Sequence, residues 1–283
     1  MKSIRLHTAV LPAVLILVFG AGLPLLVILG ISFAQRDAFG GIHYEWSWGN
    51  YTRAFGALYL PIYLRSLGLA LLTTVSCLVL AFPLAYFMAL QKKAWVKNSM
   101  VFLVTLPFWT SFLVRTYAWI ILLRSEGLIN STLLRWGIIS EPLNLMYNHF
   151  AIGIGLVYGE LPFMILPLYA VLERLDKNLL DAAADLGSSG WRVFARVVLP
   201  LSQSGLWAGV LLVFIPALGA FITPDLLGGA KTLMVGNVVQ SQFAVVRDQP
   251  FGSAVACFLT VIVLVLMWIG YRSARQSAEV RVL

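Results

Sequence analysis

Six long apolar runs dominate this sequence and leave few folds open to it. They cover about residues 9–33, 66–90, 99–123, 150–172, 202–222 and 252–271. Each run provides the roughly 20 helical residues that cross the hydrocarbon core of a bilayer. A backbone inside lipid must satisfy its own hydrogen bonds, so apolar runs of this length predict helices. We therefore expect an all-α polytopic membrane protein with six transmembrane helices in a single domain, residues 1–283.

The composition excludes a large soluble catalytic part. Of the 283 residues, 60% are hydrophobic and 11% are charged, against about 45–50% and about 25% in an ordinary soluble domain. The first run follows Lys2, Arg5 and His7 and so begins like a signal peptide. It is longer than the roughly 7–15 apolar residues of a signal peptide, and we expect an uncleaved first span.

Basic residues in the connections predict the orientation, because Lys and Arg gather on the cytoplasmic side. With both termini, the 91–97 turn and the 177–200 loop placed inside, 12 basic residues are cytoplasmic and 7 are external, and Arg115 lies within a span. The twelve are Lys2, Arg5, Lys92, Lys93, Lys97, Arg174, Lys177, Arg192, Arg196, Arg272, Arg275 and Arg281, and the seven are Arg36, Arg53, Arg65, Arg124, Arg135, Lys231 and Arg247. The net charge of +8 is then explained by topology and does not indicate a nucleic-acid partner.

The segment 177–200 is neither a span nor a plain polar loop. Asp176 is a suitable N-cap for a helix, and Gly187 with Ser188 supplies its stop. A helix of about ten residues is too short to cross a bilayer. On composition, this segment is either an amphipathic helix lying on the membrane surface or an element that docks into another protein.

The spacing of residues within this segment resembles a known motif. Asp181-Ala182-Ala183, three residues, Gly187, nine residues, Val197, one residue and Leu199-Pro200 match the EAA loop of ABC importer permeases, with Asp in place of Glu and Val in place of Ile. The resemblance implies the type I ABC importer permease fold. It also implies that this loop forms a coupling helix seated in a groove of a cytoplasmic ATPase subunit. The matching positions for that contact are Asp181, Ala182, Ala183, Gly187, Leu199 and Pro200.

Longer stretches from about residue 60 onward resemble the permeases of spermidine/putrescine importers. They are Pro107-Phe108-Trp109-Thr110, Arg115-Thr116-Tyr117, Leu161–Met164, Pro167–Tyr169, Asp225–Lys231, Gly236-Asn237 and Arg247-Asp248-x-Pro250. The resemblance implies an inner-membrane importer of polyamines or of another small solute. It implies as partners a second permease, two copies of an ATPase subunit and a periplasmic solute-binding protein. ATP would be bound by the ATPase, so we expect no cofactor in this chain.

Two ionisable residues, Glu160 and Arg115, fall in the middle of predicted spans. Such charges are expensive in hydrocarbon, so they should face the protein interior or a water-filled path. Glu160 either attracts a cationic amine on the translocation path or pairs with Arg115 as a structural ion pair. Aromatic residues near them, Trp109, Tyr117 and Tyr158, are candidates to surround an alkylammonium through cation–π contacts, although aromatic residues in spans also serve packing.

The sequence gives no sign of enzyme chemistry. It has no HExxH, no G-x-S-x-G and no carboxylate cluster suited to a metal, and we expect neither a catalytic residue nor a metal site. Cys77 and Cys257 lie inside apolar runs and are expected to be small core residues. The rival interpretation is a stand-alone secondary transporter or channel, in which residues 177–199 are only a surface helix. A membrane-embedded enzyme is a more distant alternative.

Overall fold

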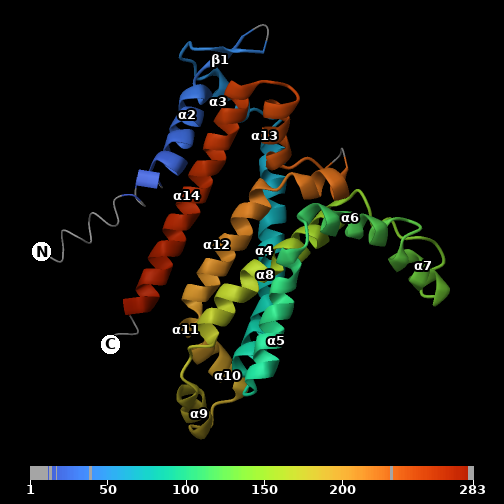
Figure 1. The fold of residues 1–283 in the computed structure, drawn as a ribbon, viewed down its shortest axis with the longest axis vertical. Coiled ribbons are helices and arrows are strands. Elements are labelled where there is room, and N and C mark those ends of the chain that lie inside the picture. The colour runs from blue at the N-terminus through green and yellow to red at the C-terminus, as the bar shows by residue number, and fades with distance from the viewer. Residues whose placement is uncertain (1–11, 13–14, 17, 38–39, 230–231, 280–283) are drawn as a thin grey trace, which may run out of the picture. The chain divides into compact units, whose positions relative to one another are not determined.

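The computed structural model describes residues 12, 15–16, 18–37, 40–229 and 232–279, and it is built almost entirely of helices (Figure 1). The basic residues Lys2, Arg5, Lys231 and Arg281, and the start of the first apolar run, lie outside these ranges. The described chain divides into two compact units. Unit 1 is 1–62 with 238–263, and unit 2 is 63–237 with 264–283.

The helices follow the apolar runs of the sequence. In chain order the elements are η1 (Val18–Gly22), α2 (Leu23–Ser32), β1 (Gln35–Arg36), β2 (Ile42–His43), α3 (Gly49–Ala54), α4 (Leu60–Leu90), α5 (Ala94–Thr105), η2 (Leu106–Trp109), α6 (Phe112–Leu123), α7 (Leu128–Arg135), α8 (His149–Leu172), α9 (Lys177–Asp185), α10 (Gly190–Val193), η3 (Phe194–Val198), α11 (Leu199–Leu201), α12 (Gln203–Gly219), η4 (Pro224–Gly228), α13 (Val235–Ala244) and α14 (Gln249–Glu279). Strands β1 and β2 form a small antiparallel pair.

Three of these helices are long and apolar enough to cross a membrane: α4, α8 and the 249–272 part of α14. Two further candidates are bent pairs. Among the described residues the structure thus offers three spans, or up to five if each bent pair crosses as one. The predicted first span is represented by a shorter apolar helix over Val18–Ser32.

The third apolar run is not the continuous helix that the sequence predicts. It is broken between Trp109 and Phe112, and the two arms meet at 92°. Pro107 lies in the 3₁₀ turn η2 before the break, and a proline removes a backbone donor and clashes with the preceding turn. Ser111 is extended, with ψ of 137°. Residues after the break, including Arg115, therefore lie on a different arm from Trp109.

The fifth run begins at a second bend. Helical residues Gly190–Leu201 meet α12 at 69°. At this corner the Ser202 backbone N–H donates to the Val198 carbonyl at 2.9 Å, and its hydroxyl donates to Leu199 at 3.0 Å. A buried serine thus satisfies the backbone groups that the bend would leave open.

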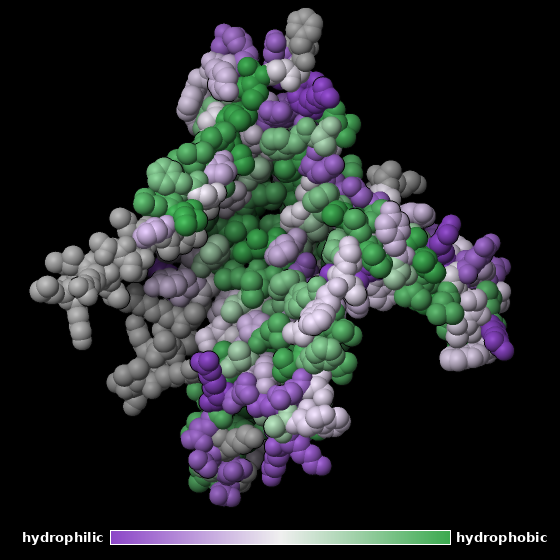
Figure 2. Space-filling model, in the orientation of Figure 1, coloured by the Kyte–Doolittle hydropathy of each residue, from purple (hydrophilic) through white to green (hydrophobic). Residues whose placement is uncertain are grey.

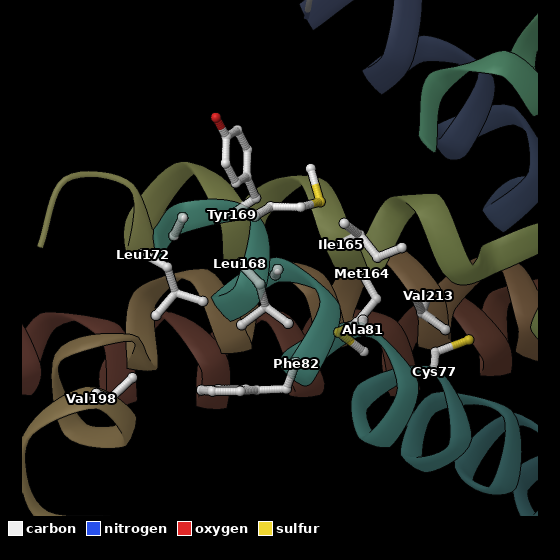
Figure 3. Packing of buried hydrophobic residues seen from close by; sticks show 13 residues of the cluster. Cys77, Ala81, Phe82, Met164, Ile165, Leu168, Tyr169, Leu172, Val198 and Val213 are labelled. Atoms are coloured by element: carbon white, nitrogen blue, oxygen red, sulfur yellow. The ribbon is translucent and has the colours of Figure 1, made fainter. Parts of the chain in front are cut away.

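The core of unit 2 joins α4, α8 and α12. Cys77, Ala81 and Met88 of α4 are fully buried against Met164 and Leu168 of α8, with Val213 of α12 closing the cluster (Figure 3). Cys77 is thus a small core residue, as the sequence predicts.

Two glycines bring α12 onto the backbone of α8. A Cβ built on Gly205 would lie 2.7 Å from the Pro167 carbonyl oxygen, and one on Gly209 would lie 2.6 Å from the Met164 sulfur. In lipid, helices associate through close packing of this kind, because the surrounding acyl chains are as apolar as the side chains. The contact at Gly205 places Pro167 of α8 next to the first turn of α12.

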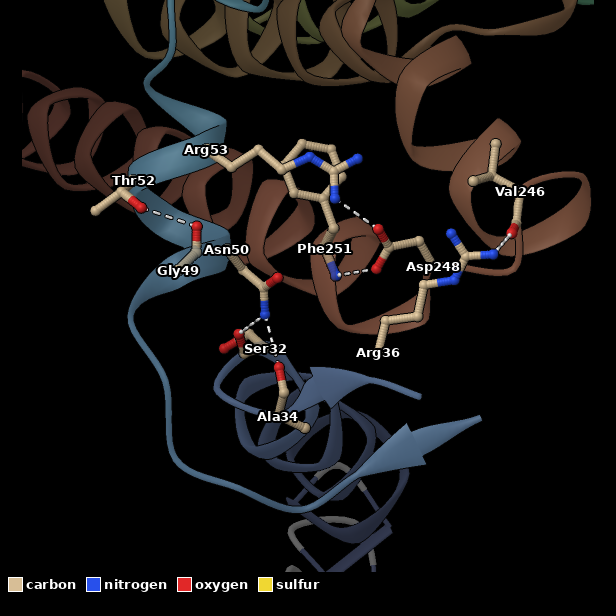
Figure 4. Close-up of polar contacts among 10 residues, drawn as sticks. All are labelled: Ser32, Ala34, Arg36, Gly49, Asn50, Thr52, Arg53, Val246, Asp248 and Phe251. Atoms are coloured by element: carbon tan, nitrogen blue, oxygen red, sulfur yellow. Dashed lines mark hydrogen bonds and ion pairs between the residues drawn. The ribbon is translucent and has the colours of Figure 1, made fainter. Parts of the chain in front are cut away.

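Unit 1 is held at one end by a buried carboxylate. Asp248 accepts from the Arg53 guanidinium at 2.7 Å and from the Phe251 backbone N–H at 3.2 Å, so it caps α14 while pairing with α3 (Figure 4). The Arg53 guanidinium also lies 4.0 Å from the centre of the Phe251 ring. Nearby, Asn50 donates to the carbonyls of Ser32 and Ala34. These bonds fix the polar connection that the sequence shows between its first two apolar runs.

Substitution of Gly205 should destabilise the chain far more than the same substitution at Gly153. Gly205→Val places its methyl groups against a backbone carbonyl that cannot move without moving α8, whereas a Cβ at Gly153 meets nothing within 4 Å. We expect Gly205→Val to lower the free energy of unfolding by about 1–3 kcal/mol or more, measured by thermal unfolding in detergent. Equal melting temperatures for the two variants would contradict the close approach of α12 to α8.

Candidate functional site

The segment 177–200 contains the helix that the sequence predicts. The Asp176 carboxylate accepts from the Asn178 backbone N–H at 3.0 Å, so Asp176 is the predicted N-cap. Gly187 has φ of +73°, and the Ser188 N–H donates to the Ala183 carbonyl at 3.1 Å. This left-handed glycine followed by a six-to-one hydrogen bond ends α9 in a Schellman motif, which confirms the predicted stop.

One side of the segment is anchored in unit 2. Leu180 and Phe194 pack against the hydrophobic core, and the Phe194 ring meets Phe82 of α4 edge-on at 5.1 Å. Val198 is fully buried in the same core. The segment is therefore packed onto the core that α4, α8 and α12 share.

The other side of the segment is an exposed mixed surface. Leu186 is 86% exposed and Trp191 is 74% exposed, and Trp191 stacks on Phe194 at 5.4 Å. Asp181 and Ala182 are exposed beside them, and Ala183 is partly buried. Figure 2 shows polar residues gathered at the end of unit 2 that holds α9 and α10. Large apolar side chains exposed among polar ones are typical of protein-binding surfaces.

Leu199 and Pro200 lie at the 69° corner between the segment and α12. Both are exposed, while their neighbours Val198 and Ser202 are buried. The corner is thus a fixed angle through which a displacement of α9 and α10 would be passed to α12.

An ion pair ties the beginning of α5 to the end of α8 near this segment. The Lys97 ammonium pairs with Glu173 and lies 5.8 Å from the centre of the Tyr169 ring. The hydrogen bond from Lys97 holds the pKa of Glu173 below its ordinary value of 4.5, and the bond to Glu173 raises the pKa of Lys97. Both charges are partly exposed, so the pair is a modest contribution to stability.

Glu160 and Arg115 are not in direct contact. Among the described residues no ion pair of 4.0 Å or less joins them, although they lie within electrostatic range of each other. Glu160 Oε2 and the Nε and one terminal nitrogen of Arg115 are buried and have no hydrogen-bond partner. The structural ion pair considered from the sequence is therefore absent from this conformation. Unpartnered charged atoms of this kind suit a site that is filled by water or by a ligand.

The candidate path aromatics are dispersed. Tyr158 lies two residues before Glu160 on α8, and its ring meets Trp119 of α6 edge-on at 5.7 Å. Trp109 lies before the 92° break and is 78% exposed, while Tyr117 is exposed on α6. The structure places Tyr158 close along α8 to Glu160, but it does not gather all the predicted aromatics around that carboxylate.

One polar cluster was not singled out from the sequence. Asn237 of α13 is buried, and its side-chain amide donates to the Phe221 carbonyl at 2.9 Å and to the Asp225 carboxylate, while its oxygen accepts from Met234 at 3.0 Å. Asn237 therefore ties the end of α12 to η4 and α13. The family resemblance already included the two segments Asp225–Lys231 and Gly236-Asn237. Nothing in the sequence indicated that Asn237 contacts Asp225.

Within the part of the chain that the structure describes, no group of three or more His, Cys, Asp or Glu side chains is placed to hold a metal ion.

Comparison with known proteins gives matches along most of the chain. The family model "binding-protein-dependent transport system inner membrane component" matches residues 81–277. The chain is 44% identical over 254 residues to the spermidine/putrescine transport system permease protein PotB of Escherichia coli, covering 89% of this chain and 92% of that protein. It is 43% identical over 257 residues to PotB of Haemophilus influenzae, covering 91% and 90%. The inner membrane ABC transporter permease protein YdcU of Escherichia coli is 35% identical over 240 residues, covering 80% and 75%.

Solved structures share the fold. A chain of a bacterial ABC transporter for the acidic polysaccharide alginate matches with a TM-score of 0.77 at 15% identity, covering 97% of this chain and 96% of that one. A chain of the MetNI methionine ABC transporter matches with a TM-score of 0.57 at 16% identity, covering 77% and 95%. At these identities the likeness concerns the fold alone.

Acidification should remove the contribution of the Lys97–Glu173 pair. A carboxylate whose pKa is lowered in the folded state stabilises it above the unfolded pKa, and this stability is lost as the pH falls through the folded pKa. We expect Glu173→Gln to lower the melting temperature at neutral pH and to melt like the wild type once the pH is well below 4.5, the ordinary pKa of glutamate. Thermal unfolding in detergent across this pH range measures it. A difference that persists unchanged at low pH would rule out the ion pair as its cause.

Proposed function

Because this chain belongs to the family of inner membrane components of binding-protein-dependent transport systems, we propose that it is the permease subunit of an ABC importer for polyamines such as putrescine and spermidine. The observation that supports a polyamine substrate is the 44% identity, along 89% of the chain, to a spermidine/putrescine permease. Its partners are an ATPase subunit in two copies, a second permease and a periplasmic solute-binding protein. ATP is bound by the ATPase and not by this chain.

We place the chain in the inner membrane with six spans and both termini in the cytoplasm. The excess of basic residues, 12 against 7, supports this orientation. Of the six spans, α4, α8 and α14 are single helices of sufficient length, and the two bent pairs would supply two more. The sixth is the first apolar run, of which Val18–Ser32 is described as an apolar helix.

In this proposal α9 is the coupling helix, and the ATPase contacts the face that carries Asp181, Ala182 and Leu186. The burial pattern supports this role, because Leu180 and Phe194 hold the segment to unit 2 while Leu186 and Trp191 remain exposed. Closure of the ATPase pair would displace the segment. Leu199 and Pro200 would pass that displacement into α12, which moves with α8 because Gly205 and Gly209 lock the two helices together.

Glu160 is the proposed carboxylate of the path. It lies on α8, and one of its oxygens is buried without a partner. A protonated amine would satisfy this oxygen with a charge-assisted hydrogen bond. Arg115 opposes a cation by charge, and because it does not neutralise Glu160 by direct pairing in this conformation, the carboxylate is left available. Tyr158 lies two residues before it on α8, a spacing that does not bring the two side chains face to face. Tyr158, Trp109 and Tyr117 are therefore proposed to line other parts of the path.

Uptake of labelled putrescine and spermidine by cells that carry or lack this gene, with the partner subunits present, tests the proposal. Uptake should disappear with the gene. Glu160→Gln should reduce it by about ten-fold or more, because a hydrogen bond to a charged group is worth about 1.5–3 kcal/mol. The control Glu141→Gln removes an exposed carboxylate and should transport normally. Polyamine uptake that does not depend on the gene would leave the family assignment standing and point to another small solute.

Gly187 provides a separate test of coupling. Its φ of +73° is a conformation that β-branched residues adopt only as outliers. Gly187→Val should therefore disrupt the end of α9 and abolish uptake, while the protein still inserts into the membrane. Gly187→Asn should retain much of the activity, because Asn tolerates this conformation.

Gly190→Val is the matched control, since Gly190 lies three residues away, does not have positive φ and has nothing within 4 Å of its Cβ position. Binding-protein-stimulated ATP hydrolysis by the purified complex reports coupling directly. Wild-type stimulation in Gly187→Val would exclude α9 as the coupling helix.

A further inference from the structure

An apolar groove of about 340 Å³ runs between α4, α5 and α8 of unit 2. It is lined by Leu84, Met88, Met100, Leu103, Val104, Pro107, Tyr158, Leu161, Pro162 and Ile165. This volume falls in the range of small-molecule sites, about 300–1,000 Å³. The tyrosine hydroxyl is the one polar side-chain group among these residues, so the groove suits a hydrocarbon ligand.

The groove has a rigid floor and an open side. Met88 and Ile165 are fully or almost fully buried at its base, whereas Leu103 on its wall is 62% exposed. Methionine side chains adapt to irregular apolar partners, and the floor carries Met88 with Met100 beside it. An open apolar groove on helices that cross a membrane faces acyl chains.

The turn that joins α4 to α5 carries two lysines at one end of this groove. Lys92 and Lys93 are exposed, and among the described residues neither takes part in an ion pair of 4.0 Å or less. Met88 lies four residues before Lys92, and Met100 lies seven after Lys93, so the groove begins within two turns of helix. Lys97 is already paired with Glu173 and is not needed here.

Trp95 marks the level of the membrane surface at this turn. It is 77% exposed in the first turn of α5, and tryptophan is enriched where a span leaves the hydrocarbon. The order along the chain is thus basic turn, interfacial aromatic residue and apolar groove. That order matches the headgroup, interface and acyl chain of a phospholipid.

We propose that this groove holds an acyl chain of an anionic phospholipid whose phosphate is bound by Lys92 and Lys93. Basic groups beside a pocket between transmembrane helices select anionic headgroups, and the apolar lining of the groove accepts the acyl chain of the lipid. A bound lipid would fill the space between α5 and α8 next to the 92° break of the third apolar run.

Photolabelling of the full-length chain in phosphatidylcholine vesicles tests the proposal. The probe is phosphatidylglycerol with a photoactivatable diazirine in one acyl chain, compared with the same probe on phosphatidylcholine, and labelled peptides are identified by mass spectrometry. We expect phosphatidylglycerol to label the groove residues, Leu103 and Tyr158 among them, more strongly than phosphatidylcholine. Removing each lysine should reduce that preference by about five-fold.

Two variants separate the headgroup contact from the groove. The double variant Lys92→Gln/Lys93→Gln should equalise the two probes, whereas Arg192→Gln/Arg196→Gln, which removes the same charge from exposed positions elsewhere, should keep the preference. Leu103→Trp fills the groove and should abolish its labelling by both probes while the lysines remain.

Three results would overturn the proposal. They are equal labelling by both lipids in the wild type, an unchanged preference without the two lysines, and loss of groove labelling when the chain is assembled with its second permease. The last result would show that a helix of the partner subunit, and not a lipid, occupies the groove.

Discussion

The close approach of α12 to α8 is the contact on which the rest of unit 2 depends. Hydrophobic burial gives little drive for helices to associate in lipid, so packing distance decides which pairs hold. At Gly205 the side chain is only a hydrogen atom, and the Pro167 carbonyl fills the space where a Cβ would lie. This contact fixes the position of α12, and with it the corner at Ser202 and the segment that leads into that corner.

The two bends give this helical frame its particular geometry. At the first bend, Pro107 and Ser111 lie between the arm that holds Trp109 and the arm that holds Arg115. One apolar run therefore forms two helical arms that point in different directions. At the second bend, the Ser202 hydroxyl donates a hydrogen bond to the Leu199 carbonyl. The groove between α4, α5 and α8 reaches Pro107, just before the first bend.

Sequence reasoning succeeded where a single local pattern was sufficient. The apolar runs, the N-cap at Asp176 and the stop at Gly187 each depend on residues within one or two helical turns, and the structure has all three helical features. The family resemblance was carried by spacing along one segment, and the match over residues 81–277 bears it out. The prediction of one continuous helix was wrong for the third apolar run, because apolar character alone does not reveal the effect of Pro107. The sequence did not predict that Asn237 would join Asp225, and it left open whether Glu160 pairs with Arg115, since both depend on contacts between segments that are apart in the sequence.

The separation of inner and outer faces in the 177–200 segment has a consequence for how such a protein can change over time. Leu180, Phe194 and Val198 are constrained by their own chain, because they are packed into its core. Leu186 is 86% exposed, and Trp191 is 74% exposed and touches the core only through the outer side of the Phe194 ring. If α9 is the coupling helix that we propose, substitutions on the outer face would alter which ATPase subunit is accepted without disturbing the membrane domain. Under the proposed function, a permease of this kind can exchange one ATPase for another through a handful of surface residues while its transport pathway stays the same.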